Sequence, residues 1–161
     1  MPPGDLVIET AFSVDVPNDG KVYNNVQAGC LFYLDDDNYI KLGRSSIFET
    51  RQTEFAKELK PVPPGYPRYG NTVVGPPGAT HTYIRIVRRI WQNGETYSAY
   101  TSQNGHDWVR GGTWDHQLGT RAQLGLFAMG GSGFVATFDY VRVSRPLLYN
   151  PDSSSAERSL K

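Results

Sequence analysis

THTYIRIVRRIWQNGETYSAYTSQNGHDW, the stretch from Thr80 to Trp108, decides the fold of this chain. In its first half Ile84 and Ile86 fall on one parity, while Arg85 and Arg89 fall on the other. A period of two is what a β-strand with one buried face requires, because successive side chains point to opposite faces of a sheet. The stretch therefore begins with a strand that presents isoleucines to a core and arginines to the opposite face.

Two turn signals follow within the same stretch. The pair Asn93-Gly94 accepts the positive φ angles of a two-residue hairpin turn, and the residues from Thr96 to Ser102 resume a strand. Asn104-Gly105 then repeats the turn signal. Arg88 breaks the apolar parity, so we expect a bulge or the strand end near it. Closely spaced hairpin turns make an antiparallel sheet the organising element of the chain.

The rest of the chain continues the alternation, interrupted by two regions without it. Further strands are predicted over 5–14, 25–34, 39–42, 46–53, 122–129 and 134–144. The pattern disappears between Glu54 and Ala79, where prolines and glycines are dense, and 110–120 is predicted to be a loop. About eight strands and no convincing helix predict an all-β, two-sheet antiparallel sandwich.

Length and composition fit one domain. The 161 residues predict a single β-sandwich over 1–149, with a Pro-rich loop at 60–79 and a disordered tail at 150–161. The chain holds 17 glycines and 11 prolines, which favour short strands and turns. Sixteen basic residues balance sixteen acidic ones, so no global field attracts nucleic acid, and no nucleic-acid partner is expected.

The sequence contains no apolar run long enough to span a membrane, so no membrane partner is expected. Its start, MPPGDLVIE, lacks the basic and apolar regions of a signal peptide. The linker-like Pro-Pro-Gly favours a piece of a larger secreted bacterial protein over a cytoplasmic one.

Few residues suggest chemistry, and no catalytic residue is assigned. Asp35 to Asp37 are interpreted as turn formers, and Glu49 is the better catalytic candidate by parity, although a salt bridge explains it more simply. Cys30 is alone and falls on a core parity, which indicates a buried thiol. No cofactor is expected except a possible structural calcium ion, held by Glu9 and Asp139 if the terminal strands pair.

Several blocks resemble concanavalin A-like (laminin G-like) jelly-roll domains. They are VQAGCLF at 26–32, DNYIKL at 37–42, YIRIVRR at 83–89, YTSQNGHDW at 100–108, LGLFA at 124–128 and FDYVRV at 138–143. The nearest resemblance is to the β-sandwich modules of bacterial glycoside hydrolases, including those that follow family 43 xylosidase and arabinofuranosidase propellers, and to domain of unknown function 1349.

The resemblance implies a jelly roll that binds sugars on its concave sheet or on edge loops. Mapped by parity, with Trp114 added as a loop aromatic, the candidate ligand residues are Gln27, Tyr33, Tyr39, Lys41, Glu49, Arg51, Arg85, Arg89, Tyr100 and Trp114. Aromatic faces stack on sugar C–H surfaces, while charged and amide groups bond to hydroxyls.

These inferences predict a non-catalytic carbohydrate-binding or accessory module of a secreted polysaccharide-degrading enzyme. Its partners would be an oligo- or polysaccharide and a neighbouring catalytic domain. Two alternatives stay open. One is a glycan-active hydrolase or lyase that uses Glu49, and the other is a structural domain that packs on a neighbouring catalytic domain.

Overall fold

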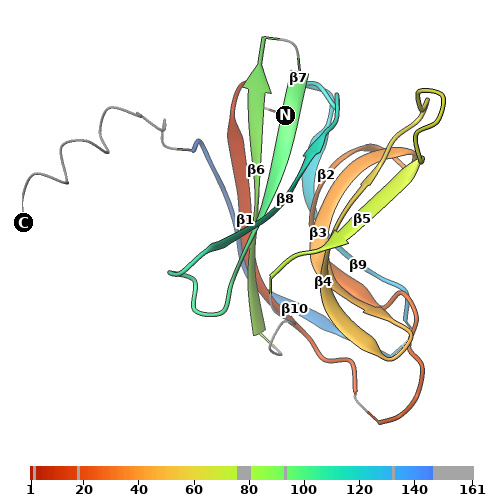
Figure 1. Ribbon diagram of the computed structural model, residues 1–161. Helices are drawn as coiled ribbons and strands as arrows, with labels where there is room; N and C mark the ends of the chain where they lie inside the picture. The colour runs from red at the N-terminus through yellow and green to blue at the C-terminus, as the bar shows by residue number, and fades with distance from the viewer. Residues whose placement is uncertain (2, 18, 76–80, 93, 132, 147–161) are drawn as a thin grey trace, which may run out of the picture.

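The computed structural model describes residues 1, 3–17, 19–75, 81–92, 94–131 and 133–146. The predicted tail at 150–161 and Asn93 of the first hairpin turn lie outside these residues. In the described part, two five-stranded antiparallel sheets face each other, which confirms the predicted all-β sandwich (Figure 1). No described helix has the length and apolarity needed to cross a membrane.

The strands divide evenly between the two sheets, here named sheet A and sheet B. Sheet A has the order β10 (Ala136–Ser144), β1 (Leu6–Val14), β6 (His81–Trp91), β7 (Gly94–Ser102) and β8 (Val109–Asp115). Sheet B has the order β5 (Tyr69–Val73), β4 (Thr50–Glu58), β3 (Asn38–Ile47), β2 (Gln27–Asp35) and β9 (Gln123–Met129).

The core lies between the sheets and follows the predicted alternation. Sheet A contributes Leu6, Ile8, Phe12, Ile84, Ile86, Tyr97 and Ala99, and sheet B contributes Ala28, Cys30, Phe32, Ile40, Leu42 and Phe55. Phe32 of one sheet meets Tyr97 of the other edge to face, with ring centroids 5.0 Å apart. Residues of the opposite parity therefore form two outer faces on opposite sides of the sandwich.

The opening stretch forms the predicted hairpin. β6 pairs antiparallel with β7, and Arg85 lies opposite Tyr100 while Ile86 lies opposite Ala99. At the second predicted turn Gly105 has a φ of +77°, a value that suits glycine. The Asn104 side chain accepts hydrogen bonds from the amides of His106 and Asp107, which closes that turn.

Arg88 causes no bulge in the pairing of β6 with β7, because a buried partner satisfies this side chain, and β6 ends three residues later at Trp91. β6 pairs with β7 without interruption to Trp91, and Arg88 is fully buried. Arg88 Nη2 donates to Glu95 Oε1 at 2.6 Å, and Tyr97 donates its hydroxyl to Glu95 Oε2 at 2.7 Å. The backbone amides of Leu118 and Gly119 also donate to Glu95, so the ion pair fixes the loop after β8.

Three predicted boundaries are wrong. The single strand over 46–53 is divided, since β3 ends at Ile47 and β4 begins at Thr50. The region after Glu54 holds the second half of β4 and all of β5, and the predicted loop at 110–120 contains most of β8.

Glycines explain why β5 and β8 lack an apolar pattern. A Cβ on Gly70 of β5 would lie 3.3 Å from the Trp114 ring of β8, and a Cβ on Gly111 of β8 would lie 2.5 Å from Val74. The edge strands of the two sheets approach closely through glycines instead of through large apolar side chains.

Glu95→Ala should lower the free energy of unfolding by about 3 to 5 kcal/mol, because it leaves the Arg88 guanidinium buried without its counter-ion. Urea denaturation monitored by tryptophan fluorescence measures this change. Glu49→Ala, at an exposed turn, is the control and should stay within about 0.5 kcal/mol of the unsubstituted protein. A loss below about 1 kcal/mol in Glu95→Ala would contradict the assigned role of the pair.

Candidate functional site

The predicted ligand residues do not share one face. Four lie on the outer face of sheet B: Gln27, Tyr33, Tyr39 and Lys41. Three lie on the outer face of sheet A: Arg85, Arg89 and Tyr100. The parity of these seven residues was predicted correctly, but strands β2 and β3 belong to a different sheet from β6 and β7. The two sets are therefore separated by the full thickness of the sandwich.

The three remaining candidates lie elsewhere. Glu49 is in the exposed turn between β3 and β4, so the strand parity assigned to it does not apply. The parity predicted for Arg51 is wrong, because Arg51 has the same parity in β4 as the core residue Phe55. Arg51 donates to the carbonyls of Val16 and Pro17, which ties β4 to the chain after β1. Trp114 is half-buried at the β5/β8 side of the core and donates its indole N–H to the carbonyl of Phe55, so it is not a free loop aromatic.

A polar cluster lies beneath the surface of the outer face of sheet B. Lys41 is 7% exposed and Glu54 only 3% exposed, although both side chains point away from the core. Lys41 Nζ donates to Gln27 Oε1 at 2.6 Å and lies 4.0 Å from Glu54 Oε2. Glu54 Oε2 is buried and has no hydrogen-bond partner in the described residues. We name Gln27, Lys41 and Glu54 the Lys41 cluster.

Aromatic rings cover the Lys41 cluster. The Lys41 ammonium lies 5.7 Å from the centre of the Tyr69 ring and 6.0 Å from that of Phe127. Tyr69 donates its hydroxyl to Glu54 Oε1 at 2.5 Å, and the amide of Asn71 donates to the same oxygen. Burial lowers the pKa of the Lys41 ammonium, while the charge of Glu54 opposes this shift.

A groove adjoins this cluster on the same face. It has a volume of about 240 Å³, and its lining includes Tyr33, Phe127, Leu31 and Gly125. Gly43 makes room for Phe127, since a Cβ there would lie 2.7 Å from the ring. The groove therefore combines an aromatic surface with a neighbouring set of charged and amide groups. We name it the Phe127 groove.

Sequence reasoning missed Glu54, Tyr69, Asn71 and Phe127. Phe127 belongs to a predicted strand, and its parity, opposite to that of Leu126, was a usable signal. Glu54 alternates with the buried Phe55, but it lay where no strand was predicted. Tyr69 and Asn71 are on β5, an exposed edge strand whose sequence carries no apolar signal.

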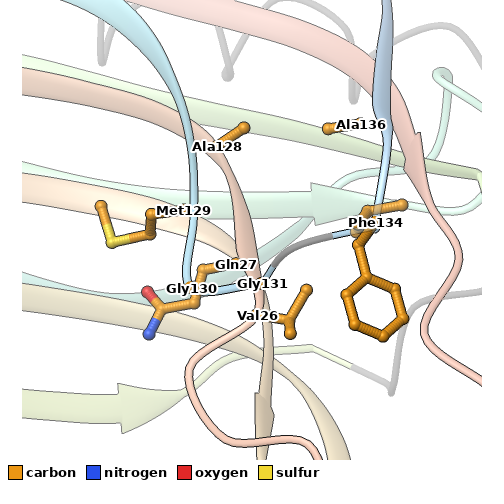
Figure 2. A pocket seen from close by; sticks show the side chains of 9 residues that line it. Val26, Gln27, Ala128, Met129, Gly130, Gly131, Phe134 and Ala136 are labelled. Atoms are coloured by element: carbon orange, nitrogen blue, oxygen red, sulfur yellow. The ribbon is translucent and has the colours of Figure 1, made fainter.

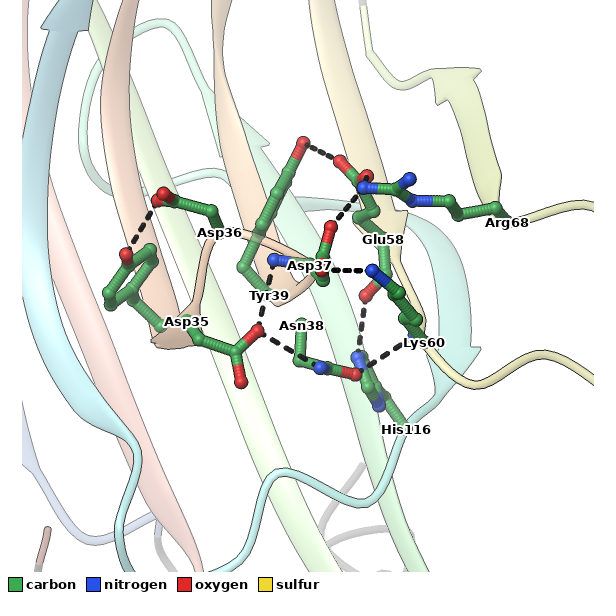
Figure 3. A network of polar contacts seen from close by, with 10 residues as sticks. Asp35, Asp36, Asp37, Asn38, Tyr39, Glu58, Lys60, Arg68 and His116 are labelled. Atoms are coloured by element: carbon green, nitrogen blue, oxygen red, sulfur yellow. Dashed lines mark hydrogen bonds and ion pairs between the residues drawn. The ribbon is translucent and has the colours of Figure 1, made fainter.

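The aspartates at 35–37 form a turn, as their sequence indicated (Figure 3). Asp35 accepts from the amide of Asp37, and Asp37 pairs with Lys60 at 2.9 Å and with Arg68. Arg68 also contacts Glu58 at 2.7 Å. The network joins the β2–β3 turn to the chain after β4, which is a structural role.

His116 lies beside the same network. Its Nε2 is 2.7 Å from the carbonyl oxygen of Glu58, while its Nδ1 is buried without a partner among the described residues. A proton on Nδ1 would therefore find no acceptor. Burial lowers the pKa of His116 below its ordinary value of 6.5, with a smaller opposing effect from the Glu58 carbonyl.

The two carboxylates proposed for calcium do not fit a calcium site. Glu9 accepts hydrogen bonds from Arg85, Tyr140 and Arg142, and Asp139 pairs with His81 at 2.6 Å. Calcium takes six to eight oxygen ligands, whereas both oxygens of Glu9 and Oδ2 of Asp139 already have side-chain partners. Within the described part of the chain, no three His, Cys, Asp or Glu side chains are grouped to hold a metal ion.

A smaller apolar cavity opens at one end of the sandwich (Figure 2). It has a volume of about 120 Å³, and Ala128 of β9 and Ala136 of β10 point toward each other across it, near Phe134. The sandwich is thus incompletely filled where β9 ends and β10 begins.

Comparisons with solved structures agree with the fold. Over 89% of its length the chain superposes on 28% of a xylan β-1,4-xylosidase from Bacillus halodurans C-125, with a TM-score of 0.64 and 19% identity. A GH43 protein from Bacillus licheniformis gives the same coverage with a TM-score of 0.62 and 18% identity. This chain resembles the β-sandwich region of GH43 glycoside hydrolases. It spans less than a third of either hydrolase.

A functionally unknown protein from Saccharomyces cerevisiae is also similar. It has a TM-score of 0.70 and 13% identity over 90% of this chain and 72% of that one. No protein-family model matches the sequence, and no curated protein matches it. The resemblance to domain of unknown function 1349 therefore stays a prediction, and the low identities show the fold alone.

His116→Gln should weaken the loss of stability in mild acid. The folded-state pKa of His116 is below the unfolded value of 6.5, so the unfolded chain binds the proton first as the pH falls. The stabilisation is thus complete above about pH 6.5 and is lost as the pH falls toward the folded-state value. Urea midpoints measured between pH 7.5 and 5 test this, and equal slopes for both proteins would contradict it.

Proposed function

We propose that this chain is a non-catalytic carbohydrate-binding module, and that a neutral glycan lies in the Phe127 groove against the Lys41 cluster. The observation that carries this proposal is the buried Lys41 and Glu54 pair on a face that looks away from the core. A folded chain gains little by burying charges there, because apolar residues of similar size are often as stable or more stable. A ligand that bonds to these groups supplies a reason for keeping them.

The chemistry of the groove suits a sugar. Tyr33 and Phe127 offer ring faces for the C–H surface of a pyranose, and Gly125 keeps the floor between the strands low. Asn71 and Gln27 have amide groups that donate to and accept from hydroxyls. Glu54 Oε2 is an acceptor that has no hydrogen-bond partner among the described residues.

The volume of the groove fits one part of a polysaccharide better than a whole small ligand, since pockets for drug-sized molecules begin at roughly 300 Å³. Such a site binds with modest affinity, on the order of micromolar to millimolar, because a few contacts must offset the ordering of the ligand. The similarity to one region of GH43 hydrolases supports an accessory role in a larger secreted bacterial enzyme. Nothing around Glu49 favours the hydrolase alternative.

A second candidate role is packing against a neighbouring catalytic domain. The observation that favours it is the open side of the sandwich between β9 and β10. Val141 and Val143 have the parity of core residues, opposite Thr10 and Ile8, but are 51% and 46% exposed. Leu126, which lies opposite Cys30 in β9, is 39% exposed. An apolar surface of this kind is typical of contact with another protein surface.

Phe127→Ala should weaken binding to a neutral polysaccharide about tenfold, because the sugar loses its stacking surface. Affinity gel electrophoresis measures this, with xylan as the first polysaccharide because one structurally similar protein is a xylan β-1,4-xylosidase. The melting temperature should change by only a few degrees, since Phe127 lies outside the core.

Phe48→Ala is the matched control, because Phe48 is 66% exposed in the turn between β3 and β4. It should bind as the unsubstituted chain does. Equal affinities for the two variants would contradict the placement of the site. Absence of binding across a panel of neutral polysaccharides would contradict carbohydrate binding and favour the packing role.

A further inference from the structure

The outer face of sheet A carries a depression unrelated to the Phe127 groove. It has a volume of about 450 Å³, and four arginines line it: Arg85, Arg89, Arg142 and Arg145. Tyr100 and Ser144 add hydroxyl groups to the lining. The carboxylates that these arginines contact are Glu9 and Asp5, so the face keeps an excess of positive charge although the whole chain is neutral. We name it the arginine face.

Two of the guanidinium groups are held in fixed positions. Arg85 lies on the Trp108 ring, 3.9 Å from its centre, and Arg142 lies 5.1 Å from the centre of the Tyr140 ring. Both donate to the buried carboxylate of Glu9, at 2.9 and 3.1 Å. A side chain that is already ordered loses little conformational entropy when a ligand binds. The anchoring contacts therefore also prepare these groups for an anion.

Donors remain available on each guanidinium. A guanidinium carries five N–H donors, and Glu9 occupies Nε and Nη2 of Arg85 but only Nη1 of Arg142. No described side chain forms a hydrogen bond or ion pair with Arg145. The remaining donors match the planar fork of a carboxylate, which arginine binds through two parallel hydrogen bonds.

A second depression continues the arginine face toward the β6–β7 hairpin. Its volume is about 340 Å³, and its lining includes Trp91, Asp115 and Gln117. Trp91 is 64% exposed, an unusual state for a large aromatic side chain. Arg89 lies between the two depressions, because it precedes Trp91 by two residues on the same face of β6 and pairs with Thr96, which lines the second depression.

From this arrangement we infer that the arginine face binds a polysaccharide that carries carboxylate groups, such as a polyuronate. The arginines bind the carboxylates, and Trp91 stacks on the apolar face of a neighbouring sugar ring. Asp115 and Gln117 bond to hydroxyls of that sugar ring. This site is independent of the neutral-glycan site on sheet B, and each can fail without the other.

The test uses the full 161-residue chain in affinity gels that contain polygalacturonate or its methyl-esterified, neutral form. Polygalacturonate should retard the protein at low ionic strength, the ester should retard it far less, and added salt should weaken the retardation. The double variant Arg142→Gln, Arg145→Gln should bind polygalacturonate about tenfold or more weakly, because charge-assisted hydrogen bonds are lost. Its binding to neutral xylan should be unchanged.

Arg121→Gln is the matched control, since Arg121 is exposed and lies outside both depressions. Glu9 keeps Arg85 as a partner in the double variant, so we expect the double variant to fold, and circular dichroism checks this. If the double variant does not fold, Arg145→Gln alone is compared with the control. Phe127→Ala should keep full binding to polygalacturonate.

Three results would overturn the inference. The first is no retardation by polygalacturonate, and the second is equal affinity in the double variant and in Arg121→Gln. The third is competition by a single-stranded oligouridylate at the same concentration as the polyuronate, which would make the face a general polyanion surface.

Discussion

Only one face of each strand in this sandwich packs against the opposite sheet, and that constraint determines where most polar side chains of the strands lie. Apolar residues of one parity fill the space between sheets A and B, and residues of the other parity lie on one of two outer faces. Lys41 on β3 and Arg85 on β6 have the same relation to the core but lie on opposite sides of the molecule. The fold thereby produces two polar surfaces of different chemistry from one alternating pattern.

The strands that the sequence predicted well include β1, β2 and β6 in the interior of the sheets and also the edge strands β9 and β10. In β1, β2 and β6 one parity is mostly apolar because the opposite sheet covers that side of each strand. β5 and β8 were missed because they are edge strands that approach each other through Gly70, Gly111 and Gly112. A pattern of large apolar residues cannot arise where the neighbouring backbone leaves no room for them. The fold class was therefore predictable, while the edge formed by β5 and β8 was not.

Arg88 shows that the sequence of one strand does not reveal which partner in another strand a buried charge will have. A charged residue on the core parity predicts an interruption, since an unpaired buried charge is costly. Its partner Glu95 comes from the next strand, and the hairpin register brings the two together. Glu95 then also binds backbone amides of the loop at 118–119, which no local pattern encodes. An ion pair between two neighbouring strands can offset the cost of burying a charge, although the sequence of one strand alone shows only the cost.

The candidate site was only partly predictable for a related reason. Parity placed Gln27, Tyr33, Tyr39 and Lys41 correctly on an outer face, but sheet order decides which strands share that face, and it depends on long-range pairing. The pairing of β9 with β2 brings Phe127 beside Gly29, and the pairing of β4 with β3 brings Glu54 beside Gly43.

Gly29 and Gly43 face outward on neighbouring strands of sheet B. Glycine has no side chain to pack and makes a strand more flexible, so a structural reason is expected for both residues. At Gly43 the cause is the Phe127 ring, which occupies the place of the missing side chain. At Gly29 a Cβ would meet the backbone of Leu42 and Gly43, so the two glycines let β2 and β3 approach closely beneath that ring. The aromatic surface of Phe127, the two glycines and the buried Lys41 and Glu54 pair thus occupy neighbouring positions on one outer face, and the packing of each depends on the others.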